Sequence, residues 1–359
     1  MASNKQATET TARALVEQGV AWFAEQITAE AASDHPYVQQ AARSYLAILQ
    51  AGGKRLRGQL AVLGYRLHGG TDDELIAHVA GAIEGLHAHL LVIDDVADHA
   101  RARRGVRTAH VQLQDFLQEK GASQQQALIA NDMAISFSLM VQQRAQMIFG
   151  ELAATPARRL RVLRVLNQHL ARTGRGQVLD MASGTGMTLS RDDIAGIAQR
   201  KTSYYSFQMP LEIGAILAGA PRSSLWLLAD FSKHAGMAFQ QADDLMGVFG
   251  DEAKMGKSAK SDIVEGKQTL LMHDALEAAS AAERQILRAA LGNPSLSDAD
   301  FARCQEIITA TGARQRTEQI VQREVELALG ALGLAPSSWP AAELAELRAL
   351  TSHIIDRRS

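Results

Sequence analysis

Apolar residues along this chain recur at the spacing of an α-helix in nearly every segment. Val16, Val20, Phe23 and Ile27 fall on one helical face, and the stretch 34–36 breaks the pattern. Later apolar stretches keep the same period. They predict further helices over about 37–49, 57–67, 124–150, 157–182, 190–218, 222–248, 263–291, 297–330 and 340–356.

The longest apolar helix is expected to begin after the glycine pair at 69–70. Thr71 is a suitable N-cap, and Glu74 stands at the capping-box distance from it. The apolar positions then lead at helical spacing toward a group of aspartates, through Ile76, Val79, Ile83, Leu86 and Leu90. We therefore expect this helix to deliver carboxylates to the end of an apolar face.

The sequence has no alternating strand pattern with hairpin turns, no internal repeat and no low-complexity linker. It predicts an all-α fold, a single-domain bundle of ten or more helices around a central cavity, spanning 1–359. The motif-bearing core covers about 50–270, and 271–359 supply C-terminal helices. The clearest loop is the lysine- and glycine-rich stretch 250–268.

Composition narrows the function further. The chain has 37 Lys and Arg against 39 Asp and Glu, a net charge of −2, which argues against a nucleic-acid binder. Cys304 is the only cysteine, so an intrachain disulfide and a cysteine zinc cluster are excluded. The opening residues lack the apolar run of a signal peptide, and no stretch reaches the ~18 apolar residues of a membrane span. We expect a cytoplasmic protein without a membrane span.

The stretch "LLVIDDVADHARARRG" at 90–105 places three carboxylates after an apolar run. Asp94 and Asp98 share a helical face with His87, and Asp95 lies beside them. Carboxylates near an apolar interior are costly unless a cation meets them. Either the arginines that follow in the same stretch neutralise them, or a ligand does.

A second acidic pair lies in "AFQQADDLMGVFGD". Gln240, Asp243, Asp244 and Gly247 recur there at helical spacing, again within apolar sequence. Two helices that each present paired carboxylates could surround one cavity. Carboxylate oxygens suit Mg²⁺, which is commonly held by one or two carboxylates together with substrate phosphates.

Basic residues near these acids supply the other half of such a site. They are Lys54, Arg55, Arg57, Arg103, Arg104, Lys201, Lys257 and Lys267. Metal-binding carboxylates ringed by Lys and Arg suit a polyanion such as a diphosphate, and apolar helix faces could hold a hydrocarbon tail. A DDxxD pattern alone more often belongs to a solvated helix surface, in which Asp98 and Arg101 form an ordinary surface pair.

The order of the motifs decides between these readings. GGKRLRG, H-x6-DDxxD-x4-RRG, KT, FQ-x2-DD, GK and GKQT follow one another across residues 52–269. This arrangement resembles the trans-isoprenyl diphosphate synthase (polyprenyl synthetase) family, short-chain type. The resemblance implies the isoprenoid synthase bundle and a Mg²⁺-dependent prenyltransferase that condenses isopentenyl diphosphate with dimethylallyl, geranyl or farnesyl diphosphate. It also implies a homodimer.

The resemblance assigns roles to individual positions. The resemblance implies about three Mg²⁺ ions with bound diphosphate. Their ligands fall on Asp94, Asp95, Asp98, Asp243 and Asp244, and these residues form the catalytic group together with Lys201. The isopentenyl diphosphate site falls on Lys54, Arg57, His87 and Arg104. The allylic diphosphate site falls on Arg103, Lys201, Thr202, Gln240, Lys257 and Lys267. The implied reaction is ionisation of the allylic diphosphate followed by attack of the isopentenyl double bond.

The chain departs from the family's pattern in the second acidic motif. Gly247 stands where that motif commonly ends in aspartate, and Asp251 follows one turn later. The metal on that side is expected to have fewer direct ligands, and activity is expected to survive.

Product length in the family depends on residues four or five positions before the first motif, here Leu90 and His89. Leu86 lies about one further turn, or one isoprene unit, below them. The absence of an aromatic residue there favours geranylgeranyl diphosphate (C20), with C15 if His89 blocks the tunnel and C25 or more if the floor is lower. His89→Phe is expected to shorten the product.

Two other functions use related features. A catalytically silent regulatory subunit would share the fold, but the intact acidic pairs and cations argue against it. A terpene cyclase also ionises a diphosphate, but GGKRLRG and RRG, which the family uses for a second diphosphate, disfavour it.

Overall fold

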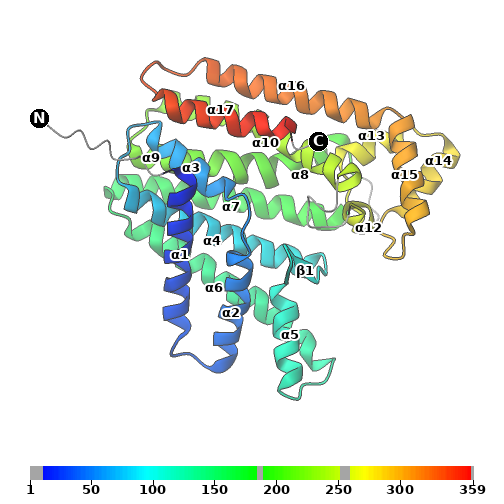
Figure 1. Ribbon diagram of the computed structural model, residues 1–359, viewed down its shortest axis with the longest axis horizontal. Coiled ribbons are helices and arrows are strands. Elements are labelled where there is room, and N and C mark those ends of the chain that lie inside the picture. The colour runs from blue at the N-terminus through cyan, green and yellow to red at the C-terminus, as the bar shows by residue number, and fades with distance from the viewer. Residues whose placement is uncertain (1–10, 184–188, 251–258, 357–359) are drawn as a thin grey trace, which may run out of the picture.

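Helices make up almost all of the regular structure in the computed structural model, which describes residues 11–183, 189–250 and 259–356. The α-helices are α1 (Ala12–Ala31), α2 (Pro36–Gln50), α3 (Leu56–Arg66), α4 (Asp73–Ala97), α5 (Ala109–Glu119), α6 (Ile129–Glu151), α7 (Pro156–Ser183), α8 (Arg191–Ala198), α9 (Met209–Ala218), α10 (Arg222–Phe249), α12 (Ser261–Val264), α13 (Leu270–Ala278), α14 (Ala281–Ala290), α15 (Asp298–Ala310), α16 (Ala313–Gly333) and α17 (Ala341–Asp356) (Figure 1). The predicted all-α bundle of ten or more helices is confirmed.

Four short elements complete the described chain. A 3₁₀ turn, η1 (Gln126–Leu128), precedes α6, and a π-helical segment, η2 (Gln199–Gln208), joins α8 to α9. The strands β1 (Ala102–Arg103) and β2 (Val106–Arg107) pair antiparallel after α4. The sequence analysis did not anticipate this small hairpin, because two-residue strands carry no alternating pattern.

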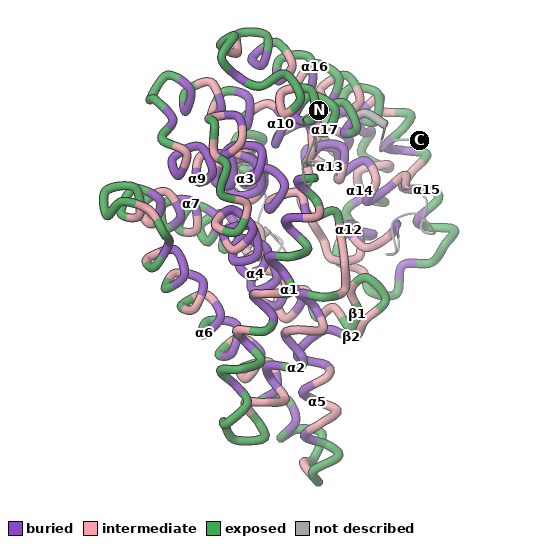
Figure 2. The backbone as a smooth tube through the Cα atoms, turned by 60° about the vertical axis from the view of Figure 1, so that its left-hand side comes forward, coloured by how far each residue is buried: buried purple, intermediate pink, exposed green. Residues whose placement is uncertain are grey.

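Helix α4 runs through the centre of one half of the bundle, packed against α1, α3 and α6. It is long and apolar enough to cross a membrane, but 72% of its most apolar window is buried inside the protein. Figure 2 shows buried backbone along much of its length. Such burial is that of a core helix in a folded bundle.

The N-cap of α4 differs from the predicted one. Asp72, rather than Thr71, accepts a hydrogen bond from the backbone N–H of Leu75 at 2.9 Å. The carboxylate of Asp72 also favours the positive end of the helix dipole. The capping-box pattern at Thr71 and Glu74 therefore misplaced the start by one residue.

The other half of the bundle is built on α10, which packs against α16 and η2, while α3 packs against α9. One continuous apolar core extends from Ala12 to Ile354. A smaller apolar cluster consists of Leu189, Ile194, Ile197 and Leu270. The expectation of a single domain stays a prediction, and this continuous core is the observation that supports it.

Several predicted helices are divided in the structure. The stretch 263–291 is split into α12, α13 and α14, and Gly266, with φ of +72°, ends the first turn. The stretch 297–330 is split at Gly312, which has φ of +75°. Glycine at 266 and 312 permits the left-handed backbone that stops a helix, and apolar periodicity alone does not reveal such a stop. Helix α5 was not predicted.

Candidate active site

The C-terminal turns of α4, α7 and α10 meet at a cavity of about 770 Å³, which residues of η2, α8 and the α12–α13 region also line. Figure 1 shows the three helices lying across the molecule. The predicted site residues that line this cavity are Lys54, Arg57, His87, Leu90, Asp94, Lys201, Thr202, Gln240, Asp243, Asp244 and Lys267. The two acidic motifs, 149 residues apart at Asp94 and Asp243, therefore face one hollow.

The first acidic motif is neutralised largely by Arg103. The carboxylate of Asp95 is fully buried; Arg103 Nε donates a hydrogen bond to its Oδ1 at 2.7 Å, and Arg103 Nη2 forms an ion pair with the same oxygen at 2.5 Å. Burial raises the pKa of Asp95, and Arg103 opposes that rise. Arg103 Nη2 also lies 3.7 Å from Asp94 Oδ2. A buried carboxylate needs such a partner, and the hairpin β1–β2 places it there.

Asp94 has two further partners across the cavity. Gln177 on α7 donates to its Oδ1 at 3.2 Å, and Lys201 Nζ lies 3.7 Å from the same oxygen. Lys201 also forms a close ion pair with Asp180 on α7. Asp94 thus joins α4 to α7 and η2 through charged and polar contacts.

Asp98 is the C-cap of α4 and faces Lys267, whose Nζ lies 3.7 Å from its Oδ2. Burial raises the pKa of Asp98 to about 6, against the opposing charge of Lys267. Lys267 also forms a close pair with Glu265. Lys267 therefore connects the first acidic motif to the opposite wall of the cavity.

The second acidic motif also contains a buried carboxylate, that of Asp244. Asp244 accepts a hydrogen bond from Gln240 Nε2 at 2.8 Å, and Gln240 in turn accepts one from the hydroxyl of Thr202. Burial, together with the nearby charges of Asp262 and Asp243, raises the pKa of Asp244 to about 8. At neutral pH this carboxyl group is partly protonated, so it can accept a cation only by releasing a proton.

Lys201 and Thr202 lie on the π-helical segment η2. Pro210 follows this segment in the first turn of α9 and cannot donate a backbone hydrogen bond to it. A widened turn of this kind is frequent at functional sites. It turns Lys201, Thr202 and Tyr205 toward the same cavity.

The basic motif GGKRLRG forms the loop before α3 and the start of that helix. Arg55 adopts the left-handed conformation, with φ of +49°, and its buried side chain lies between Glu17 and Glu84. Glu84 also accepts the backbone N–H of Gly58 at 2.9 Å. Arg55 thus holds the loop in place through its ion pairs, whereas Lys54 and Arg57 line the cavity.

The second basic motif lies directly against this loop. The guanidinium of Arg104 donates to the carbonyl of Gly52, and a Cβ at Gly53 would lie 2.5 Å from Arg104 Nη1. Arg104 itself has φ of +51°. Glycine at 53 therefore makes the room in which the two motifs meet, and strained backbone of this kind clusters at functional sites.

His87 lies between the basic motifs and Tyr205. Burial and the charges of Arg57 and Arg104 lower the pKa of His87 well below its usual range, so its imidazole is neutral. Arg57 donates to the hydroxyl of Ser206 at 2.6 Å and lies 5.0 Å from the centre of the Tyr205 ring. These contacts hold Arg57 in place at the cavity wall.

The residues predicted to set product length are divided by the structure. Leu90 lines the cavity, whereas Leu86 and His89 are not among its lining residues, and the effect of all three on product length stays a prediction. Leu86 is fully buried in the core. His89 is buried against α6, where its Nδ1 lies 2.5 Å from Ser138 Oγ. Adjacent helical positions are about 100° apart, which places His89 toward α6 while Leu90 lines the cavity.

Some cavity residues were missed by the sequence analysis, and one predicted residue cannot be placed. Gln177 and Asp180 stand three residues apart on α7, a spacing that marks one helical face. Asp262 and Tyr205 also line the cavity. Lys257 lies outside the described residues.

The donor set fits a divalent cation that is shared with a ligand. In the described ranges, no three His, Cys, Asp or Glu side chains are close enough to hold a metal ion by themselves. The carboxylates form two separate groups facing one cavity, with the side chains of Arg103 and Lys267 beside them. Oxygen donors in this arrangement suit Mg²⁺, which retains part of its coordination for substrate phosphates.

Comparison with known sequences decides the family. The sequence model of the polyprenyl synthetase family matches residues 38–308. The chain belongs to the polyprenyl synthetase family. The match includes both acidic motifs, both basic motifs and η2.

Individual members of the polyprenyl synthetase family are also similar. The geranylgeranyl diphosphate synthase of Sulfolobus acidocaldarius is 32% identical over 265 residues, which cover 73% of this chain and 74% of the relative. The geranylfarnesyl diphosphate synthase of Aeropyrum pernix is 32% identical over 295 residues, covering 81% and 86%. A crystal structure of geranylgeranyl pyrophosphate synthase from Corynebacterium glutamicum, complexed with isoprenyl diphosphate and magnesium, is 28% identical with a TM-score of 0.84, covering 96% and 98% of the two chains.

Proposed function

We propose that this protein is a Mg²⁺-dependent trans-prenyltransferase that condenses isopentenyl diphosphate with an allylic diphosphate. The observation that carries the proposal is the pair of acidic motifs, on α4 and α10, that line one cavity together with Lys and Arg. Family membership and the named activities of the relatives agree with it. We assign the allylic primer to dimethylallyl, geranyl or farnesyl diphosphate.

The acidic residues on the two helices would hold the metal. We assign Asp94, Asp98 and Asp243 to direct contact, with Asp95 and Asp244 behind them, since these two are the most buried. Bound Mg²⁺, about three ions in our proposal, neutralises the diphosphate that leaves. The solved relative from Corynebacterium glutamicum, which contains magnesium and isoprenyl diphosphate, supports the choice of metal.

The protein's own cations would complete the diphosphate sites. Arg103, Lys201 and Lys267, which pair with aspartates in the structure, are close enough to the cavity to turn toward an allylic diphosphate. Lys257 joins this group by the resemblance of its motif. Preorganised cations stabilise charge where it develops as the allylic carbon–oxygen bond breaks.

The second diphosphate site would use the two basic motifs that meet at Gly53. Lys54, Arg57, Arg104 and neutral His87 offer donors around that point. An isopentenyl diphosphate held there would present its double bond to the allylic carbon from the neighbouring site. Bringing the two carbons together in one cavity supplies much of the acceleration.

The apolar wall gives the tail a place and limits its length. Leu90, Leu91, Val178 and Met181 line the cavity beside the acids. We propose geranylgeranyl diphosphate (C20) as the main product, with farnesyl diphosphate (C15) or a C25 product as the alternatives. The relatives include both a C20 and a longer-chain synthase by name, so they leave the length open.

We further propose a cytoplasmic homodimer that binds no nucleic acid. Helix α6 carries exposed apolar residues on its outer side, Leu139 at 47%, Met140 at 56% and Met147 at 53% exposure. Figure 2 shows α6 at the edge of the molecule, with exposed segments along it. A large apolar strip on a helix suits a self-complementary interface.

One assay tests the reaction and its alternatives. Purified protein is incubated with labelled isopentenyl diphosphate, each allylic primer and Mg²⁺, and the products are separated by chain length. Labelled prenyl diphosphates longer than the primer are expected, with C20 predominant. Absence of turnover would favour a silent regulatory subunit, and hydrocarbon or alcohol from primer alone would favour a cyclase.

A further inference from the structure

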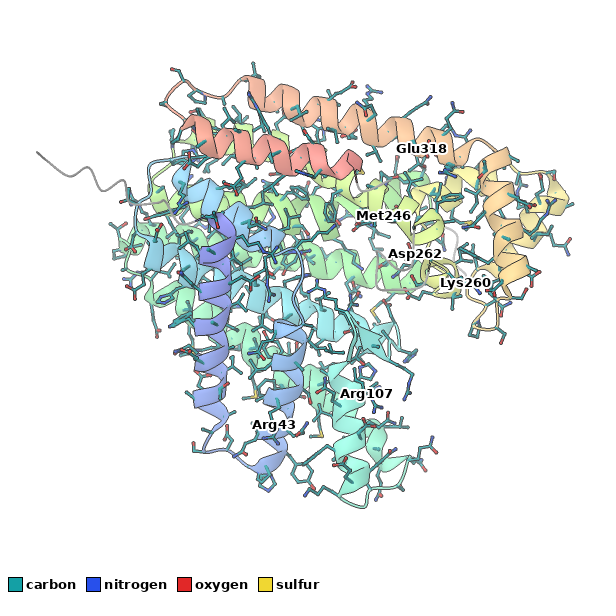
Figure 3. The ribbon with its side chains drawn as sticks, viewed as in Figure 1. Arg43, Arg107, Met246, Lys260, Asp262 and Glu318 are labelled. Atoms are coloured by element: carbon teal, nitrogen blue, oxygen red, sulfur yellow. The ribbon has the colours of Figure 1, made fainter. Side chains whose placement is uncertain are left out.

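The second acidic motif has lost its last side chain at Gly247, and another residue occupies that place. A Cβ built on Gly247 would lie 1.9 Å from Asp262 Oδ2 and 2.6 Å from Asp262 Cγ. These distances are far below van der Waals contact, so no side chain fits at 247 while Asp262 stands there. Figure 3 shows Asp262 close to Met246, the neighbour of Gly247 on α10.

The Asp262 carboxylate belongs to the cavity. Asp262 is buried, lines the cavity together with Asp243 and Asp244, and lies on the short helix α12. Its charge is the first of the neighbouring charges that raise the pKa of Asp244. It therefore stands beside the two remaining carboxylates of the second motif.

The backbone around Asp262 is fixed by its own turn. The carbonyl of Asp262 accepts the backbone N–H of Lys267 at 2.9 Å, and Gly266 between them has a positive φ. The charge of Asp262 is also the first of those that raise the pKa of Lys267. Asp262 and Lys267 thus form one rigid unit, with the acid toward α10 and the lysine toward Asp98.

A separate observation at the same wall indicates a missing electropositive partner. Gln241 is fully buried, lines the cavity and donates toward Asp244 Oδ2 at 3.5 Å. Its Oε1 is buried and has no hydrogen-bond partner in the described part of the chain. A buried acceptor without a donor is costly, and a hydrated cation would satisfy it.

We propose that Asp262 is the third carboxylate of the second acidic group, supplied by α12 in place of the side chain that Gly247 lacks, and that it helps hold a divalent cation bound with a diphosphate. This inference rests on the proposed function. It assigns the missing ligand of the motif to a residue that is 15 positions further along the chain. Because no three acidic side chains in the described ranges can hold an ion by themselves, the bound diphosphate would supply the remaining donors.

The test measures cation binding directly. Mn²⁺ is titrated into wild type and Asp262→Asn, with inorganic pyrophosphate present, and free Mn²⁺ is followed by electron paramagnetic resonance. Asp262→Asn is expected to weaken Mn²⁺ binding about tenfold, since loss of one supporting carboxylate typically costs ten- to hundredfold in metal affinity. Asp298→Asn removes an exposed acid outside the cavity and is expected to leave binding unchanged.

Two variants at Gly247 separate position from charge. Gly247→Ala keeps every acid but displaces Asp262, and it is expected to weaken Mn²⁺ binding as Asp262→Asn does. Gly247→Asp combined with Asp262→Gly returns the acid to the motif and is expected to restore wild-type binding. These two variants also decide the matter if Asp262→Asn does not fold, as judged by circular dichroism.

The outcomes distinguish this inference from the proposed function. If wild type neither binds Mn²⁺ with pyrophosphate nor elongates a primer, the proposed function fails. If wild type does both while Asp262→Asn and Gly247→Ala bind Mn²⁺ with unchanged affinity, Asp262 is no part of the cation site and only the present inference is overturned.

Discussion

At the scale of single residues, the site depends on side chains placed where another residue makes room or supplies charge. Arg104 can lie against Gly53 because glycine has no side chain. A methyl group at this position would overlap the Arg104 guanidinium. Asp95 can remain buried because Arg103 donates a hydrogen bond to it and forms an ion pair with it. The first pair links two motifs that are distant in the sequence, and the second joins the acidic and basic parts of the stretch 90–105.

Gly53→Ala is expected to raise the KM for isopentenyl diphosphate by about tenfold, or about 1.4 kcal/mol in binding, because Arg104 must move away. The KM for the allylic substrate should change far less. Steady-state kinetics with each substrate varied in turn gives the two constants. Gly69→Ala is the control, since Gly69 also has a positive φ, +78° against +126° at Gly53, and has nothing within 4 Å of its Cβ. Equal effects of the two substitutions would exclude a specific role for the contact.

The raised pKa of Asp244, about 8, predicts how stability responds to pH. The folded carboxyl group holds a proton that the unfolded chain, with a pKa near 3.8, has released. Its stabilising contribution is therefore full below that lower value and is lost as the pH rises through about 8. Between pH 7 and 9, in EDTA, the free energy of unfolding should fall by about 1 kcal/mol from this group.

Denaturant unfolding at several pH values measures this dependence. Asp244→Asn cannot titrate and should show a flatter profile over the same range. A profile for that variant as steep as that of wild type would assign the effect to other groups.

At the scale of elements, the face of α4 determines which residues meet the substrate tail. His87, Leu90, Leu91 and Asp94 share one face and line the cavity, while His89 points toward Ser138 on α6. The helical period in the sequence already places Leu90 on that face. The π-helical geometry of η2 could not be predicted in the same way, because a π-turn depends on tertiary packing as well as on the proline just beyond it.

Leu90→Phe is expected to shorten the main product by at least one isoprene unit, because a ring at this position fills the cavity beside the first motif. His89→Phe should lose the contact with Ser138 and lower the melting temperature, with product length little changed. Chromatography of the dephosphorylated products and thermal unfolding test both statements. A shorter product from His89→Phe with Leu90→Phe unchanged would reverse the assignment.

At the scale of the whole molecule, the sequence predicts the acidic motif on each of α4 and α10 better than it predicts that the two motifs face one cavity. The acidic stripes on α4 and α10 follow from local helical spacing, and the resemblance of the motifs brings them together. Asp180 and Asp262 escaped prediction because their relevance comes from contacts with Lys201 and Gly247, which only the folded chain creates. The division of the C-terminal helices escaped for a related reason, since a single glycine can end a helix without altering the apolar period.

The proposed homodimer makes a prediction about mass. Leu139→Lys combined with Met140→Lys places two charges on the exposed side of α6 and should shift the protein from dimer to monomer in sedimentation equilibrium. Leu327→Lys, on the exposed side of α16, is the control and should leave the mass unchanged. A wild-type monomer, or a double variant that remains dimeric, would rule out this face as the interface.

The ion pairs of Arg103, Lys201 and Lys267 with the first motif have a consequence for repeated turnover. After pyrophosphate and its ions depart, unshielded aspartates would repel one another and drive α4 and α10 apart. Lysine and arginine can instead return to the aspartates, so the vacated protein retains the shape that the next substrates require. The same competition weakens the hold on departing ions, which favours rapid discharge of the by-product over its retention.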